Sequence, residues 1–325
     1  MKPVIVSGIQ PTGALHIGNY LGALKNFVEL QNSGEYAPFF FIADLHSLTI
    51  DYTPEEKQAQ VLDIAASYLA AGLNPKKATL FIQSHVPAHS ELGWILSTIT
   101  PMGELERMTQ FKDKSERGNV NAGLFTYPTL MAADILLYGA AAVPVGDDQD
   151  QHLELTRTIA RKFNSRFGQT FTEPKSKHTA IPRLMSLDNP LKKMSKSLPA
   201  GCLFMDDAPE IIEKKIMTAV TDSGKEVKYD PELKPGISNL LMIQSALTGL
   251  HINDLIEEYG GSNYGEFKKA VAKAVTEHFA PFREAKLKLL KNPKKVMDIF
   301  EAGAKKAAKV ADKKLTEVKS KIGLI

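Results

Sequence analysis

The chain is poor in cysteine. Its 325 residues include a single one, Cys202. One cysteine excludes an internal disulfide, and it is too few for a thiolate zinc site or an iron–sulfur cluster built by one chain. We therefore expect neither a disulfide framework nor a sulfur-ligated metal centre.

Long hydrophobic runs are also missing. No stretch approaches the roughly twenty apolar residues that cross a bilayer, and residues 1–6 lack the long apolar region of a signal peptide. We expect a soluble, cytoplasmic protein with no membrane association. The composition, 43% hydrophobic and 24% charged, predicts a large buried core, and 325 residues suit two domains better than one.

Charge imbalance is small overall but uneven along the chain. A formal net charge of +3 does not by itself indicate nucleic-acid binding. Between Ala285 and Ile325, however, there are twelve lysines against four acidic residues. Solvated helix faces explain most such lysines, but a basic helical platform would also suit a long anion such as RNA.

A lysine-rich loop is the most informative stretch. Residues 192–197 hold three lysines and two serines, between Pro190 and Pro199. Prolines at both ends prevent a long helix, and ammonium and hydroxyl donors stabilise charge on a transferring phosphoryl group. The string Lys-Met-Ser-Lys-Ser at 193–197 resembles the second signature of class I aminoacyl-tRNA synthetases.

The first signature of that class has a counterpart near the N-terminus. Residues 3–7 are predicted to form a strand, residues 8–13 a turn, and a helix with one apolar face starts at His16. A helix start after such a turn presents free amides to phosphate. Gly18 leaves room for a nucleotide, and His16 and Asn19 can donate to its oxygens.

Strands and helices alternate through the first half of the chain. Near-continuous apolar runs at 37–45 and 78–83 predict buried parallel strands, and 143–146 predicts a short one. Helices are predicted between and after them at 54–71, 90–100, 103–114 and 151–161. This alternation predicts an α/β fold with a Rossmann-like, doubly wound parallel sheet that binds ligands at the carboxyl ends of its strands.

The second half is predicted to be mostly helical. Helices are expected at 209–219, 236–247, 252–259, 264–290 and 293–321, separated by glycine-containing turns. Together they predict a C-terminal helical bundle. The polar segment 115–123 is long enough to form a mobile lid.

One carboxylate stands out. Asp134 lies within the almost wholly apolar run 124–138, where an unpaired charge would cost several kcal/mol if buried. It must therefore meet solvent, a protein partner or a ligand donor, and a salt-bridged aspartate is as plausible as a ligand acceptor. His85 and His89 have metal-ligand spacing, but Pro87 between them interrupts the helix that would align them, so we expect no metal site.

With both signatures placed, the whole chain resembles bacterial-type tryptophanyl-tRNA synthetases. The similarity covers segments 7–13, 103–112, 127–136, 143–146 and 234–241 as well as the signatures. The resemblance implies a homodimer that converts tryptophan and ATP to tryptophanyl-adenylate and pyrophosphate, and the general needs of ATP chemistry imply Mg²⁺ bound with the ATP. The homodimer then transfers tryptophan to the 3′-terminal ribose of tRNA(Trp).

The resemblance also implies a domain plan. Residues 1–190 would form the catalytic domain for ATP and tryptophan, and 191–207 the signature loop and linker. Residues 208–325 would form a helical, anticodon-binding domain, with a last helix that could return to the catalytic domain.

By the same resemblance, individual residues receive roles. Lys193, Ser195 and Lys196 would be catalytic, following the pyrophosphate as it leaves. The ATP site would comprise Gln10, Pro11, Thr12, His16, Gly18, Asn19, Gly146, Asp148, Lys193, Met194, Ser195 and Lys196, with Lys112 or Lys114 as a further phosphate contact. The tryptophan site would comprise Asp134, Met131, His46, Tyr127, Gln149, Val143 and Val145.

Three alternatives remain open. Tyrosyl-tRNA synthetases share the signatures and the aspartate, but Met131 stands where they tend to carry glutamine, and a methionine suits an indole face. A catalytically idle relative that only binds RNA or a partner is disfavoured by the intact signatures. A nucleotidyltransferase acting on something other than tRNA would leave the helical, lysine-rich half without a purpose.

Overall fold

The computed structural model describes residues 2–115, 121–146, 149–178, 184–196 and 198–325, with the side chains of 113–115 outside the description. It divides into two compact units. The first comprises Met1–Thr12, Asn26–Thr179 and Asn292–Ile325, and the second Gly13–Lys25 and Ala180–Lys291. The units interleave along the chain, which differs from the predicted limits at residues 190 and 207.

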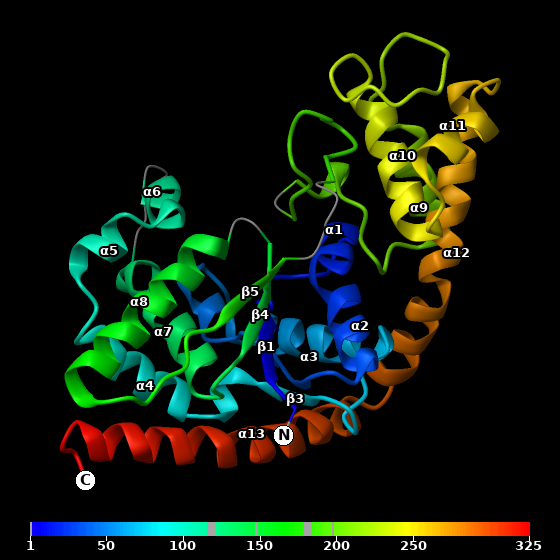
Figure 1. Cartoon of the computed structure of the whole chain (residues 1–325). Helices are drawn as coiled ribbons and strands as arrows, with labels where there is room; N and C mark the ends of the chain where they lie inside the picture. The colour runs from blue at the N-terminus through cyan, green and yellow to red at the C-terminus, as the bar shows by residue number, and fades with distance from the viewer. Residues whose placement is uncertain (1, 116–120, 147–148, 179–183, 197) are drawn as a thin grey trace. The chain divides into compact units, whose positions relative to one another are not determined.

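A five-stranded parallel sheet forms the centre of the first unit (Figure 1). Its strands are β1 (Val4–Ile9), β2 (Ala37–Ile42), β3 (Thr79–Ile82), β4 (Ala142–Val145) and β5 (Lys175–His178), in the order β3-β2-β1-β4-β5. β-branched and aromatic residues fill the central strands, as expected for strands buried on both faces. The strand order reverses between β1 and β4, where doubly wound folds bind ligands, and the predicted fold class is confirmed.

Helices connect and cover the strands of the first unit. They are α2 (Lys25–Ser33), α3 (Pro54–Ala70), α4 (Ala88–Ser97), α5 (Met102–Glu106), α6 (Thr109–Ser115), α7 (Ala122–Leu136), α8 (Asp150–Phe167) and α13 (Pro293–Lys321), with short 3₁₀ turns η2 (His46–Thr49) and η3 (Gln83–His85). The central helix, α7, packs against α4, α8 and β1. The aspartate of its apolar run is thereby carried into the interior of this unit.

The last helix, α13, belongs to the first unit. It lies against β3, α3 and α4 (Figure 1), and a side chain at Gly303 would overlap the carbonyl oxygen of Leu80 on the edge strand. Only glycine permits this approach. Lys319 pairs with Glu91 of α4 at 2.8 Å. The lysine-rich last helix therefore lies along the sheet.

Four helices and the signature segments form the second unit. The helices are α9 (Pro209–Met217), α10 (Pro235–Thr248), α11 (Ile252–Tyr259) and α12 (Tyr264–Leu290), and α12 packs against α9 and α10. The N-terminal signature contributes α1 (Ile17–Asn19) and the π-helical turn η1 (Tyr20–Leu24), while η5 (Pro199–Gly201) follows the lysine loop. The predicted helices of this half are confirmed to within a few residues.

Three local predictions were wrong or incomplete. The helix expected from His16 contains the π-helical turn, and the helix expected over 103–114 is divided into α5 and α6. Strand β5 was missed because its Lys-Ser-Lys-His sequence is polar, which is tolerated at the edge of a sheet. Most of the expected lid, 116–120, lies outside the described residues.

No helix among the described residues is long and apolar enough to span a membrane.

Candidate active site

A cavity of about 240 Å³ lies in the first unit at the switch point of the sheet. Its walls come from the carboxyl-terminal parts of β1, β2 and β4, from η2 and from α7. All seven residues predicted for tryptophan line it: Asp134, Met131, His46, Tyr127, Gln149, Val143 and Val145. Gln10, predicted for ATP, lines it as well.

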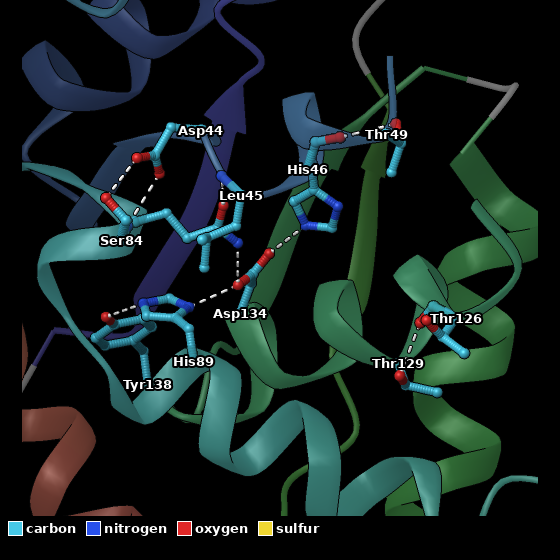
Figure 2. A network of polar contacts seen from close by, with 11 residues as sticks. Asp44, Leu45, His46, Thr49, Ser84, His89, Thr126, Thr129, Asp134 and Tyr138 are labelled. Carbon is cyan, nitrogen blue, oxygen red and sulfur yellow. Dashed lines mark hydrogen bonds and ion pairs between the residues drawn. The ribbon is translucent and has the colours of Figure 1, made fainter. Parts of the chain in front are cut away.

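Among the described residues that line the cavity, Asp134 alone carries a carboxylate, and it is 2% exposed. Its Oδ1 accepts hydrogen bonds from Gln83 Nε2 at 2.7 Å and His89 Nδ1 at 2.6 Å. Its Oδ2 accepts one from His46 Nε2 at 2.8 Å (Figure 2). The carboxylate is thus paired with protein groups and also borders a cavity.

The environment favours an ionised Asp134. Burial on its own would raise the pKa of this carboxyl, but hydrogen bonds and charge from His46 and His89 outweigh it and hold the pKa below its ordinary value. The cavity thus presents a buried anion on a wall that combines apolar and polar side chains.

Sequence reasoning missed three members of this network. Gln83, His89 and Tyr138 come from the end of β3, the start of α4 and the residues after α7. His89 had been considered only as a partner of His85 for a metal, but its two ring nitrogens contact Asp134 and Tyr138. A polar residue directly after a buried strand, as Gln83 is, was the one available signal.

Tyr127 forms a second polar group on the cavity wall. Its hydroxyl donates to Gln110 Oε1 at 3.0 Å and contacts His152 Nε2. Burial raises the pKa of Tyr127, which keeps the hydroxyl protonated. Gln110 from α6 and His152 from α8 thereby hold the hydroxyl oxygen of Tyr127, from α7, in place at the cavity.

The two class signatures meet in the second unit. Lys196 Nζ donates to the carbonyl oxygen of Gly13 at 3.0 Å. The segment after the lysine loop also pairs with the helix start, since Ile17 N–H donates to the Leu203 carbonyl oxygen at 2.9 Å and Met205 N–H to that of Leu15 at 2.9 Å. Segments almost 190 residues apart in the chain thus form one substructure.

His16 caps the helix that it precedes. Its Nδ1 accepts from the backbone N–H of Gly18 at 3.0 Å, and Asn19 Oδ1 accepts from the N–H of His16 at 3.3 Å. A Cβ on Gly18 would lie 2.8 Å from the imidazole ring. Gly18 therefore has a structural role as well as the predicted one of admitting a nucleotide.

Burial and the nearby charges of Lys196 and Lys193 lower the pKa of His16 to about 4. The ring is therefore neutral at pH 7, and because Nδ1 accepts, its proton sits on Nε2. A donor held next to two lysines suits an anionic ligand.

The base of the lysine loop is held by backbone pairing. Met185 pairs with Lys193 as an antiparallel bridge. The buried Asn239 of α10 accepts from Met185 N–H and donates to Met185 O, both at 2.9 Å. Met194 is 3% exposed, so its side chain anchors the loop in the unit.

The remaining predicted residues are less informative. Pro11 and Thr12 follow Gln10 in a turn, where Thr12 N–H donates to Gln10 O at 3.0 Å, and Gly146 follows β4. Asp148, Ser197 and the side chain of Lys114 lie outside the described residues. No group of three or more His, Cys, Asp or Glu side chains within the described part of the chain is placed to hold a metal ion.

Comparison with known proteins identifies the family. Residues 1–280 match the model of class I tRNA synthetases for W and Y. Tryptophan–tRNA ligase of Caldanaerobacter subterraneus subsp. tengcongensis is 49% identical over 99% of this chain and 98% of its own. The chain belongs to the tryptophan–tRNA ligases. The tyrosine-specific alternative is thereby set aside.

Solved structures of the tryptophan–tRNA ligase family share the fold over the full length. The Mycoplasma pneumoniae tryptophanyl-tRNA synthetase superposes with a TM-score of 0.90 at 35% identity, covering 99% of this chain and 98% of that one. The Campylobacter jejuni enzyme, solved with ADP and tryptophan, gives 0.86 at 38% identity, covering 98% and 99%.

The protonation of His16 leads to a pH-dependent stability. Because the folded pKa of about 4 lies below the ordinary 6.5, the unfolded chain binds this proton first as the pH falls. The stabilisation is fully present above pH 6.5 and is lost toward pH 4, by up to about 3 kcal/mol. Urea unfolding at a series of pH values measures this, and His16→Asn should flatten the slope in that window.

An NMR titration of the imidazole separates the causes. Lys196→Ala should raise the pKa of His16 part of the way, since burial remains, whereas Lys192→Ala should leave it unchanged. A wild-type pKa near 6.5 would contradict the assignment.

Proposed function

We propose that the chain catalyses tryptophan activation and transfer through the residues that line the cavity and those of the two signature segments. The observation that carries the proposal is the buried, ionised Asp134 at a cavity at the sheet's switch point, beside the apolar side chains of Met131, Val143 and Val145. An indole ring has one N–H donor and no acceptor, so one carboxylate oxygen satisfies it.

In the tryptophan site, the ring lies between apolar walls. Val143 and Val145 from β4 and the polarizable side chain of Met131 contact the indole faces, and His46 borders the ring near Asp134. Tyr127 and Gln149 accept from the ammonium group. Phenylalanine is rejected because it would leave the carboxylate without a donor from the ligand.

In the ATP site, His16 and the lysine loop meet the phosphates. The Nε2–H of His16 and the side chain of Asn19 donate to phosphate and ribose oxygens, and Gly18 allows their close approach. The family resemblance also assigns ATP contacts to Gln10, Pro11, Thr12, Gly146, Asp148 and Lys114, while Met194 anchors the loop.

The chemistry needs no nucleophilic side chain. The tryptophan carboxylate attacks the α-phosphorus of ATP, the bond to the bridging oxygen of the β-phosphate breaks, and pyrophosphate leaves. A hydroxyl of the 3′-terminal ribose then attacks the carbonyl carbon of the adenylate and AMP leaves. Lys193, Ser195 and Lys196 stabilise the charge that develops on the departing pyrophosphate.

Further components follow from the reaction and the family. Mg²⁺ enters with ATP, held by phosphate oxygens and water, as it prefers. The helical residues 208–291 bind the anticodon of tRNA(Trp), and the protein acts in the cytoplasm.

The first experiment is ATP–pyrophosphate exchange with purified protein and tryptophan, tyrosine or no amino acid. We expect exchange with tryptophan alone, because Met131 and the acceptor Asp134 fit an indole. Exchange driven equally well by tyrosine would overturn the specificity, and exchange with neither would favour an idle binding protein.

Lys196→Ala tests the catalytic assignment in the same assay. Removing one positioned cation from the developing charge should slow exchange by roughly 100- to 1,000-fold, about 3–4 kcal/mol. Lys192→Ala is the matched control, since this exposed neighbour precedes the signature and its backbone pairing with Ser186 survives. A near-normal rate for Lys196→Ala would remove its catalytic role.

A homodimer is also part of the proposal. The single tryptophan, Trp94 on α4, is 73% exposed, which is unusual for so large an apolar side chain and suits a subunit contact. Sedimentation equilibrium should give twice the chain mass, and Trp94→Lys should weaken the association. A single-chain mass for the wild type at micromolar concentration would exclude a stable dimer.

A further inference from the structure

The hydrogen bonds of Asp134 leave one position for a ligand. Two N–H groups fill Oδ1, and one N–H group, from His46, bonds to Oδ2. A carboxylate oxygen can accept two hydrogen bonds, so Oδ2 retains one acceptor position at the cavity. The preference of the site for a ligand with an N–H donor therefore depends on the orientation of the three protein donors. The more firmly they are held, the stronger this preference is.

The orientation of Gln83 is fixed from outside the cavity. Its Oε1 accepts from the backbone N–H of Leu45 at 3.2 Å, while its Nε2 donates to Asp134. A flipped amide would lose both bonds and place two oxygens against each other. The side chain is 0% exposed, so no solvent would compensate for the flip.

The tautomer of His89 is fixed in the same way. Its Nε2 lies 2.8 Å from the Tyr138 hydroxyl, and its Nδ1 lies 2.6 Å from Asp134 (Figure 2). Burial and the charge of Asp134 raise the pKa of Tyr138, so this hydroxyl remains protonated and can donate. An imidazole that accepts at Nε2 carries its proton on Nδ1, where it points at the carboxylate.

The surroundings prevent His89 from finding other partners. The ring is 0% exposed and lies among Phe41, Phe81 and Tyr138, with ring centroids 5.5 to 5.9 Å away. Without the Tyr138 hydroxyl, Nε2 would be an unpaired acceptor in this aromatic cage. Moving the proton to Nε2 would not help, because it would leave an unpaired donor there and turn the Nδ1 lone pair toward the carboxylate. Only a shift of the ring relieves Nε2, and a shifted ring loses the geometry of its donation to Asp134.

We propose that Tyr138 and His89 are specificity-determining positioning residues, which act through Asp134 without touching the amino acid. Tyr138 sets the proton on His89, His89 fixes the carboxylate, and the carboxylate offers one acceptor to the N–H of an aromatic ring. This inference rests on the proposed function and adds a reason why the site demands an N–H donor.

The experiment compares two substrates in pyrophosphate exchange. One is tryptophan, and the other is β-(benzothiophen-3-yl)alanine, in which sulfur replaces the ring N–H. For Tyr138→Phe we expect kcat/KM for tryptophan to fall about tenfold, mainly through KM, and that for the sulfur analogue to change less than twofold. The preference for tryptophan should therefore shrink about tenfold.

Tyr68→Phe is the matched control. This fully buried hydroxyl donates to Phe41 O at 2.9 Å and accepts from Ile9 N–H, away from Asp134. Its loss should lower the melting temperature without changing the substrate preference. An equal loss for both substrates in Tyr138→Phe, or no loss for either, would overturn the inference.

Substitutions at His89 keep the test decisive if Tyr138→Phe does not fold. His89→Asn places an amide N–H near the position of Nδ1 and should retain most of the preference, whereas His89→Leu should lose it. Equal preference in the two variants would contradict the proposal. A wild-type protein inactive with tryptophan would instead reject the proposed function, so the two failures are distinguishable.

Discussion

The structure of the first unit is organised around one buried negative charge. Asp134 is 2% exposed in the middle of an apolar helix, and an unpaired carboxylate there would cost several kcal/mol. Donors must therefore converge on α7 from other elements. They come from η2 after β2, from the end of β3 and from the start of α4, all at the carboxyl edge of the sheet, where the cavity lies.

The second unit faces the opposite electrostatic problem. Its signature segments place Lys193 and Lys196 near His16, and the helix start adds further positive potential. The unit avoids a third cation by burying the imidazole and using its Nδ1 as a helix cap. The result is a concentration of positive charge and N–H donors held in place before any ligand arrives, which is how charge-stabilising sites avoid reorganisation.

Sequence predicted most of the fold because its signals are local. The apolar runs 37–45 and 78–83 specify their own strands, and the structure has them within a few residues. Two signature strings and an aspartate in an apolar run also indicated the site. The lysine-rich last helix was harder to place, because a glycine at 303 reveals a close approach only once its partner, Leu80, is known.

The partners of Asp134 were beyond sequence reasoning for the same physical reason. Gln83, His89 and Tyr138 follow no common spacing, since β3, α4 and α7 meet only through the packing of the sheet unit. Local sequence shows that a buried charge needs donors but not which residues supply them. The identity of these donors matters for function. A donor such as His89, whose proton is held in place by the buried Tyr138, keeps its orientation when the ligand changes. Discrimination at the cavity can therefore originate in residues that never contact the substrate.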